Sequence, residues 1–146
     1  MTMTAAWQGG GPRIDWGAVF SDCRRYRYRL WRAWDPAAPT IAFVMLNPST
    51  ADELYNDQTV ERCERRGRRL GFGAMIVTNA FALRSTDPNG LRQVADPIGP
   101  DNDAAIARAA AEADLVVCGW GKHCEAVAPG RGARILATIR HAGRTP

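Results

Sequence analysis

The sequence predicts an α/β fold, in three α/β/α layers around a mostly parallel central sheet. Three short apolar runs, at 40–46, 74–79 and 115–118, have the β-branched composition of strands that are buried on both faces. A helical pattern follows each run, and alternating strands and helices favour a parallel sheet. A length of 146 residues fits one domain, which we expect over 13–146.

Two segments precede the first apolar run. Residues 1–12 end in Gly-Gly-Gly-Pro, and we expect them to form a flexible N-terminal tail. Residues 23–34 (CRRYRYRLWRAW) alternate arginine with ring and aliphatic side chains, which is typical of a half-buried antiparallel or edge strand. Its arginines form either a solvated face, the interpretation we favour, or a basic face with interleaved rings for nucleic acid.

Three helices are expected between and after the apolar runs. Helical periodicity covers 57–70, and Gly71 is suited to the position just after its C-terminal end. An Ala-rich helix is expected to run through Glu112, with Asp101-Asn102-Asp103 as its N-cap. The last helix is expected over 130–140.

The charge of the chain permits an anionic partner. Lys and Arg number 19 against 15 Asp and Glu, and Lys122 is the only lysine. Arginine matches phosphate geometry, so a nucleic acid or nucleotide partner is allowed, although a GC-rich genome also produces this composition. No apolar run approaches the ~20 residues of a membrane helix, and the first residues lack a secretory pattern. We therefore expect a cytoplasmic protein without membrane contact.

The cysteines indicate neither a metal site nor disulfides. They show no CxxC pair and no usual zinc spacing, and we expect free thiols at Cys23, Cys63, Cys118 and Cys124. The glycines at 119 and 121 lack the rest of a dinucleotide or P-loop pattern. No cofactor or metal is therefore expected.

A polar cluster follows each apolar run, at 47–52, 79–86 and 119–123. Ligands of parallel α/β sheets sit beyond the carboxyl ends of the strands. We therefore expect the three clusters to line one pocket.

The first cluster offers an amide, a hydroxyl and a carboxylate. Asn47 precedes Pro48, which fixes a turn, and its amide is placed to orient a water or hold a substrate carbonyl. Ser49 and Asp52 add further ligand contacts, with Asp52 a candidate catalytic carboxylate. The alternative is an Asx-type turn with a helix cap.

The second cluster has groups that suit a nucleotide. The acceptor and donors of the Asn79 amide match a nucleobase edge, or else satisfy nearby backbone groups. Phe81 would stack on a flat ligand, although a core position is the more common role of such a ring. Arg84 would meet a phosphate.

The third cluster combines backbone donors with a titratable ring. Gly119 and Gly121 free backbone N–H groups for a ligand, and His123 is a candidate acid or partner for a leaving oxyanion. The alternative is a structural or merely exposed histidine.

Several strings in order resemble the domain-of-unknown-function family 1643, from about Tyr28 to His123. They are NPSTAD at 47–52, NDQT at 56–59, NAFALRSTDP at 79–88, DPIGPDND at 96–103 and Gly119-Trp120-Gly121. That resemblance implies no established activity.

A more distant resemblance is to the uracil-DNA glycosylase superfamily. Residues 44–49 (VMLNPS) are similar to its first motif, and 77–79 (VTN) to its middle strand. The resemblance implies that Asn47 positions the attacking water and that Asn79 reads the base. Met45 and Ser49 depart from the glycines of that motif.

The C-terminal region departs from both families. The superfamily's late His-Pro-Ser motif is absent, as is the Gly-x-Pro-Arg-His-Pro-like segment of family 1643, and the sequence stops at Pro146. The chain is thus either truncated or a short member. Three functions stay open: cleavage of the N-glycosidic bond of a flipped base in DNA, a non-catalytic nucleotide or modified-base binding module, and a small-molecule enzyme of nucleotide metabolism.

Overall fold

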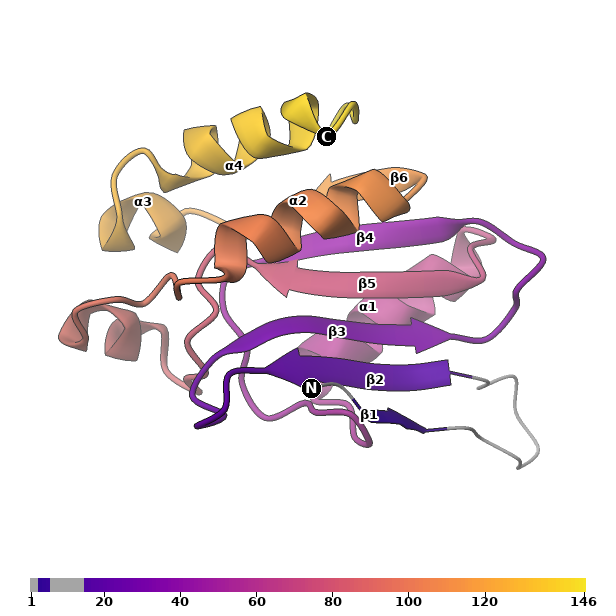
Figure 1. Cartoon of the computed structure of the whole chain (residues 1–146), viewed down its shortest axis with the longest axis horizontal. Coiled ribbons are helices and arrows are strands. Elements are labelled where there is room, and N and C mark those ends of the chain that lie inside the picture. The colour runs from indigo at the N-terminus through magenta and orange to yellow at the C-terminus, as the bar shows by residue number, and fades with distance from the viewer. Residues whose placement is uncertain (1–2, 6–14) are drawn as a thin grey trace.

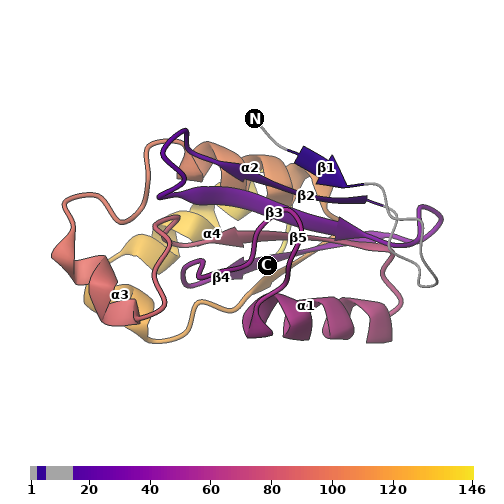
Figure 2. The ribbon, with the colours of Figure 1, turned by 90° about the horizontal axis from the view of Figure 1, so that it is seen from below.

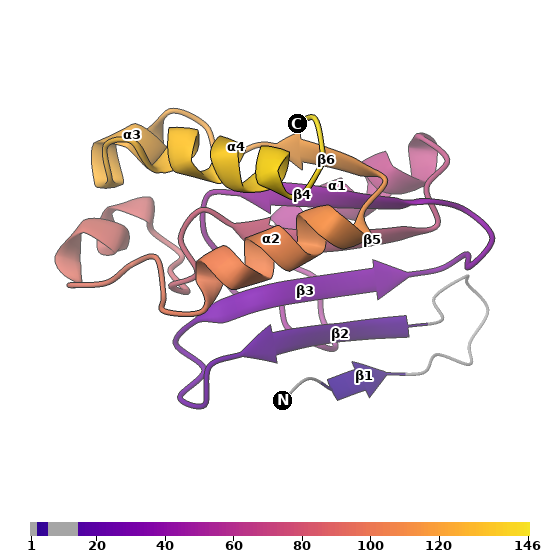
Figure 3. The same ribbon diagram turned by 45° about the horizontal axis from the view of Figure 1, so that its top comes forward.

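The computed structural model describes residues 3–5 and 15–146 and has a mixed α/β fold (Figure 1). Within these residues, six strands form one open sheet in the order β1-β2-β3-β5-β4-β6. The strands are β1 (Met3–Ala5), β2 (Asp15–Phe20), β3 (Arg27–Ala33), β4 (Thr40–Met45), β5 (Ala74–Asn79) and β6 (Leu115–Cys118). Figure 3 shows them side by side, with β1 and β6 at the two edges.

The prediction of a mostly parallel sheet is wrong. β4 is parallel to β5 and β6, but β1–β2, β2–β3 and β3–β5 are antiparallel. The three apolar runs of the sequence are the parallel part, as their composition indicated. The antiparallel half arises because β2 and β3 form a hairpin, and β2 (DWGAVF) lacks the pattern that would have revealed it.

Helices lie on both faces of this sheet (Figure 2). α1 (Gln58–Arg69) covers one face, while α2 (Asn102–Glu112) and α4 (Arg131–His141) cover the other. A short 3-10 helix at Pro88–Gln93 and α3 (His123–Val127) lie beyond the ends of the strands. Two apolar cores result, one on each face of β4 and β5.

The ends of α1 follow the local signals of the sequence. The Asp57 carboxylate accepts from the Val60 N–H over 2.9 Å and caps the helix. Gly71 follows the last turn with a φ of +89°, as predicted for the residue after the helix. Asp101 occupies the N-cap of α2 but makes no capping hydrogen bond with its side chain.

A β-bulge interrupts the alternation of β3. Val19 of β2 is opposite Arg29, whereas Phe20 is opposite Arg27, so Tyr28 is an extra residue on β3. The bulge allows Arg27 and Arg29 to point to opposite faces of the sheet. Arg29 pairs with Glu112 of α2, while Arg27 contacts residues on the side of α1.

Three further expectations concern the tail, the membrane and the thiols. The expected tail at 1–12 lies mostly outside the described residues, although Met3–Ala5 within it pairs with β2. No helix of the described residues is both long and apolar enough to span a bilayer. The prediction of free thiols is confirmed at all four cysteines.

Candidate functional site

Two of the three polar clusters come together at the carboxyl ends of β4 and β5. Met45 and Asn79, the last residues of these strands, are opposite each other. Beyond them the two segments continue side by side. The Phe81 N–H donates to the Leu46 carbonyl over 3.0 Å, and the Ser85 N–H to the Pro48 carbonyl over 2.8 Å. The parallel pairing of β4 and β5 therefore extends into a shared loop layer.

The third cluster takes a different course. The Gly119 N–H donates to the Val44 carbonyl, and the chain then turns so that Trp120 packs against the core under α2 and α4. His123 is exposed at the first residue of α3. Neither Gly119, Gly121 nor His123 lines the cleft described next.

A basic cleft of about 460 Å³ opens beside the joined clusters, and we call it the arginine cleft. Arginines and hydroxyl groups dominate its walls, with two apolar side chains beside them. Among the described residues that line it there is no carboxylate. The lining residues are Arg24, Arg25, Ser49, Leu83, Arg84, Ser85, Thr86, Gly90 and Val94.

The three arginines of the cleft differ in how much their charge is engaged. Arg24 pairs with Glu53 at 3.2 Å. The Arg84 guanidinium donates from Nε to the Ser49 carbonyl over 3.2 Å and lies above the Phe20 ring. Arg25 is exposed, and its guanidinium has no hydrogen bond or ion pair within the described residues. The cleft therefore keeps at least one unpaired positive charge.

The turn that carries these arginines is conformationally strained. Arg24 has a φ of +59° and is the only residue other than glycine with a positive φ among the described residues. Such a backbone costs an arginine about 1–3 kcal/mol. The Arg24 carbonyl accepts from the Arg84 Nη1 over 3.4 Å, which links the strained turn to the loop after β5.

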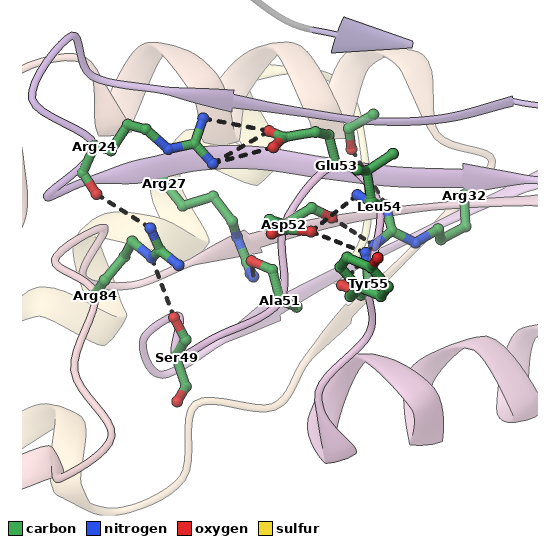
Figure 4. A network of polar contacts seen from close by, with 11 residues as sticks. Arg24, Arg27, Arg32, Ser49, Ala51, Asp52, Glu53, Leu54, Tyr55 and Arg84 are labelled. Carbon is green, nitrogen blue, oxygen red and sulfur yellow. Dashed lines mark hydrogen bonds and ion pairs between the residues drawn. The ribbon is translucent and has the colours of Figure 1, made fainter. Parts of the chain in front are cut away.

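Four arginines also hold the loop at 49–56, which we call the clamped loop (Figure 4). Most of their donors bind backbone carbonyls of the loop. Because the backbone itself is held, the loop has little freedom to move. The contacts are Arg84 to Ser49, Arg27 to Ala51, Arg24 to the Glu53 carboxylate, and Arg32 to the Asp52 and Tyr55 carbonyls. Arg27 and Arg32 are both buried, so the interpretation of the alternating arginines as a solvated face is wrong for Arg27.

Arg27 places a positive charge inside the edge of the sheet. It is 2% exposed, and its Nη2 donates to the Asn79 Oδ1 over 3.1 Å. Burial lowers the pKa of Arg27 to about 10, and the nearby Asp57 carboxylate acts in the opposite direction. Its Nε has no hydrogen-bond partner within the described residues. Arg27 thus forms hydrogen bonds with both the clamped loop and the end of β5.

The predicted catalytic groups of the first cluster are engaged in the turn. The Asn47 Nδ2 donates to the Ser85 carbonyl over 2.8 Å and to the Pro48 carbonyl over 3.1 Å. The Asp52 Oδ1 accepts from the N–H groups of residues 54 and 55, as in an Asx-type turn. Both side chains therefore shape the loops around the cleft.

The groups of the second cluster divide between core and cleft. Asn79 is 2% exposed and Phe81 is fully buried in the core, so neither presents a free face in this structure. Arg84 and Ser49 line the cleft, as expected of ligand contacts. Ser85 and Thr86 belong to the cluster at 79–86 that was expected to line a pocket, whereas Arg24 and Arg25 were not predicted as lining residues. These two arginines belong to the basic run at 23–34, which was the available signal.

A larger hollow of about 650 Å³ lies elsewhere, on the face of the sheet next to α2. Among its charged residues, Arg29 and Arg108 both pair with Glu112. It borders Thr40 and Ala74 at the amino ends of β4 and β5. Ligands of α/β sheets bind at the other ends, so the arginine cleft is the better candidate.

The fold and the cleft define a mixed α/β protein with a basic cleft at the carboxyl edge of its parallel strands. The chain belongs to a family of proteins of unknown function, DUF1643, whose model matches residues 27–145. No curated protein matches the sequence, and no solved structure matches it either. The residues of the cleft all lie within the matched region except Arg24 and Arg25.

Proposed function

We propose that this protein binds a phosphate-bearing nucleotide in the arginine cleft, either as a free molecule or within a nucleic-acid strand. The observation that carries the proposal is that Arg25, whose charge no described residue pairs, lines the same cleft as Arg84, and that the described lining residues include no carboxylate. Arginine forks donate two hydrogen bonds to one phosphate. The carboxyl edge of parallel strands is also where α/β proteins bind such ligands.

The remaining walls of the cleft suit the rest of a nucleotide. The hydroxyl groups of Ser49, Ser85 and Thr86 can donate to phosphate or sugar oxygens. The side chains of Leu83 and Val94 provide an apolar surface for a sugar or a base. A volume of about 460 Å³ lies within the range of small-ligand sites.

The test is a titration of a fluorescein-labelled, 5′-phosphorylated thymidine trinucleotide with the purified protein. We expect saturable binding that inorganic phosphate competes away. Arg25→Gln should weaken it about tenfold, which corresponds to about 1.4 kcal/mol. Arg140→Gln, an exposed arginine of α4, is the charge-matched control and should bind as the wild type. Equal binding by both variants would contradict the proposal.

Hydrolysis of an N-glycosidic bond is the second candidate function. It is favoured by one observation: both hydrogen bonds of Asn47 use its Nδ2, so the Oδ1 is left to accept from a water. That water would lie close to the loop of Ser49 and Ser85, which lines the cleft. The resemblance of 44–49 to the first glycosylase motif agrees with this role.

Base release from DNA decides between binding and turnover. Duplex and single-stranded DNA containing uracil, thymine mismatches or alkylated bases would be incubated with the protein, and free bases would be measured by mass spectrometry. Asn47→Ala should lower the rate of base release by a factor of about 10²–10⁴ if Asn47 positions the water. Saturable binding without release of any base would leave the binding function alone.

A further inference from the structure

A stripe of three unpaired arginines runs along the outer side of α1. Arg62, Arg66 and Arg69 are all exposed, and their spacing of four and three residues places them on one side of the helix. None of the three has an ion pair or hydrogen bond from its guanidinium within the described residues. We call these three residues the α1 stripe.

The other charges of α1 are already engaged with one another. Glu61 pairs with Arg65, and Glu64 with Arg68, each over one helical turn. The two carboxylates also accept from the Asn56 Nδ2, on the flank of the helix next to the clamped loop. The acidic charge of α1 is therefore turned away from the stripe and does not neutralise it.

The capping of α1 does not account for the whole stripe. Basic residues in the last turn interact favourably with the helix dipole, which gives Arg66 and Arg69 a structural role of modest size. Arg68 also lies in that turn and already supplies such a charge. Arg62 lies near the middle of the helix, where the dipole has little effect.

We propose that the α1 stripe binds successive phosphates along a nucleic-acid strand, an inference that rests on the proposed nucleotide-binding function and extends it to a polymer. At a rise of about 1.5 Å per residue, Arg62 and Arg69 are about 10 Å apart along the helix. One strand of B-DNA carries a phosphate about every 3.4 Å of helix axis, so the stripe spans about three of them.

The chemistry of α1 favours nucleic acid over a membrane surface. Helices that lie on a membrane need an exposed apolar face beside their basic one. The apolar side of α1, with Val60 and Cys63, is buried against the sheet. Leu70, just after the helix, is the one large apolar side chain exposed there. The partner is therefore recognised by charge alone, as a phosphate backbone is.

The experiment compares two triple variants on two DNA probes. In R62Q/R66Q/R69Q the stripe is neutralised, while in R108Q/R134Q/R140Q the same charge is removed from exposed positions of α2 and α4, on the other face of the sheet. The probes are a labelled single-stranded DNA 20-mer and the labelled trinucleotide. Anisotropy titrations run from about 50 to 200 mM salt.

The stripe variant should bind the 20-mer about tenfold or more weakly at 100 mM salt. Its plot of log affinity against log salt should flatten by about 2, because each lost contact with single-stranded DNA removes about 0.7. The stripe variant should bind the trinucleotide with the same affinity as the wild type. The control triple variant should show much smaller changes with both probes.

The other outcomes separate this inference from the function on which it rests. The stripe variant could keep the wild-type affinity and salt slope while Arg25→Gln weakens binding of the 20-mer. That result would overturn the proposal for the stripe and support the proposal for the cleft. If the trinucleotide fails to bind but binding of the 20-mer still depends on the stripe, the proposed function of the cleft is overturned instead. Equal losses in both triple variants, or binding of phosphatidylserine vesicles and not of DNA, overturn the stripe as a nucleic-acid contact.

Discussion

The Nη2 of Arg27 donates to the Oδ1 of Asn79 over 3.1 Å, and so joins the first residue of β3 to the last residue of β5. Both side chains are buried. The same guanidinium donates to the Ala51 carbonyl, so one cation fixes a strand end and the clamped loop together. A buried cation held by neutral groups depends on every one of its acceptors.

Asn79→Ala should lower the free energy of unfolding by about 1.5–3 kcal/mol, because it removes an acceptor from a buried charge. Urea unfolding followed by circular dichroism measures the change. Combined with Arg27→Met, the two losses should be far from additive, since the double variant has no buried charge left to satisfy. Simple addition of the single effects would show that the contact carries no energy.

Arg32→Lys should destabilise the clamped loop strongly. Arg32 donates to the Asp52 and Tyr55 carbonyls and to the Asn56 side chain, and a lysine cannot reproduce this fork. We expect a loss of about 3 kcal/mol, with faster hydrogen exchange over 51–57. Arg62→Lys, on the exposed face of α1, is the matched control and should change stability by less than about 0.5 kcal/mol. Equal effects would contradict the clamp.

The stability of the protein should fall between pH 9 and 11 through Cys63. Burial raises the pKa of its thiol from 9.0 to about 11. The neutral thiol is favoured in the folded state, so this stabilisation is complete below pH 9 and is lost as the pH rises through 11. The loss amounts to about 2–3 kcal/mol. The difference between the wild type and Cys63→Ala isolates it, and parallel pH profiles of the two proteins would refute the prediction.

Cys23 should be the first cysteine to react with iodoacetamide at pH 7.5. It is exposed, and its hydrogen bond with the Ser21 hydroxyl lowers the pKa of its thiol. Burial raises the pKa of Cys118 and Cys124. Peptide mass spectrometry over time gives the order of labelling. Ser21→Ala should slow the labelling of Cys23 and leave the other thiols unchanged; faster labelling of Cys124 would contradict the structure.

Gly73→Ala should destabilise the protein much more than Gly71→Ala. A Cβ at Gly73 would lie 1.9 Å from the Asp35 carbonyl oxygen, so the backbone itself must move. Gly71 has a φ of +89° but open space around it, so alanine there carries only the backbone cost of about 1–2 kcal/mol. Thermal melting of the two variants makes the comparison. Similar losses would show that the contact at Gly73 relaxes easily.

The elements with strong local signals could be predicted from the sequence. The bounds of β5 and β6 were predicted at 74–79 and 115–118, because apolar β-branched runs between polar turns define buried strands. Gly71 was predicted equally well as the glycine that follows the C-terminal end of α1. The sheet as a whole could not be predicted, since the pairing of β2 and β3 depends on a hairpin whose first strand has no regular pattern.

The sequence predicted the position of the candidate site better than it predicted which residues line it. The meeting of the clusters after β4 and β5 follows from parallel pairing, which a sequence pattern can indicate. The burial of Arg27 could not be foreseen, because the alternation of β3 placed it beside Arg29 on one face. One inserted residue reverses that assignment, and no local signal marks a bulge within such a strand.

Tyr28 shows how the length of a chain can matter as much as its composition. A protein lacking this single tyrosine would restore the unbroken zigzag of β3 against β2. Arg27 would then directly precede Arg29 and, by the same alternation, would still face α1 with Asn79 and Ala51 as its acceptors. The extra residue thus adds a second tyrosine that stacks on Tyr26, and a chain without it would lose that stack while keeping the buried arginine.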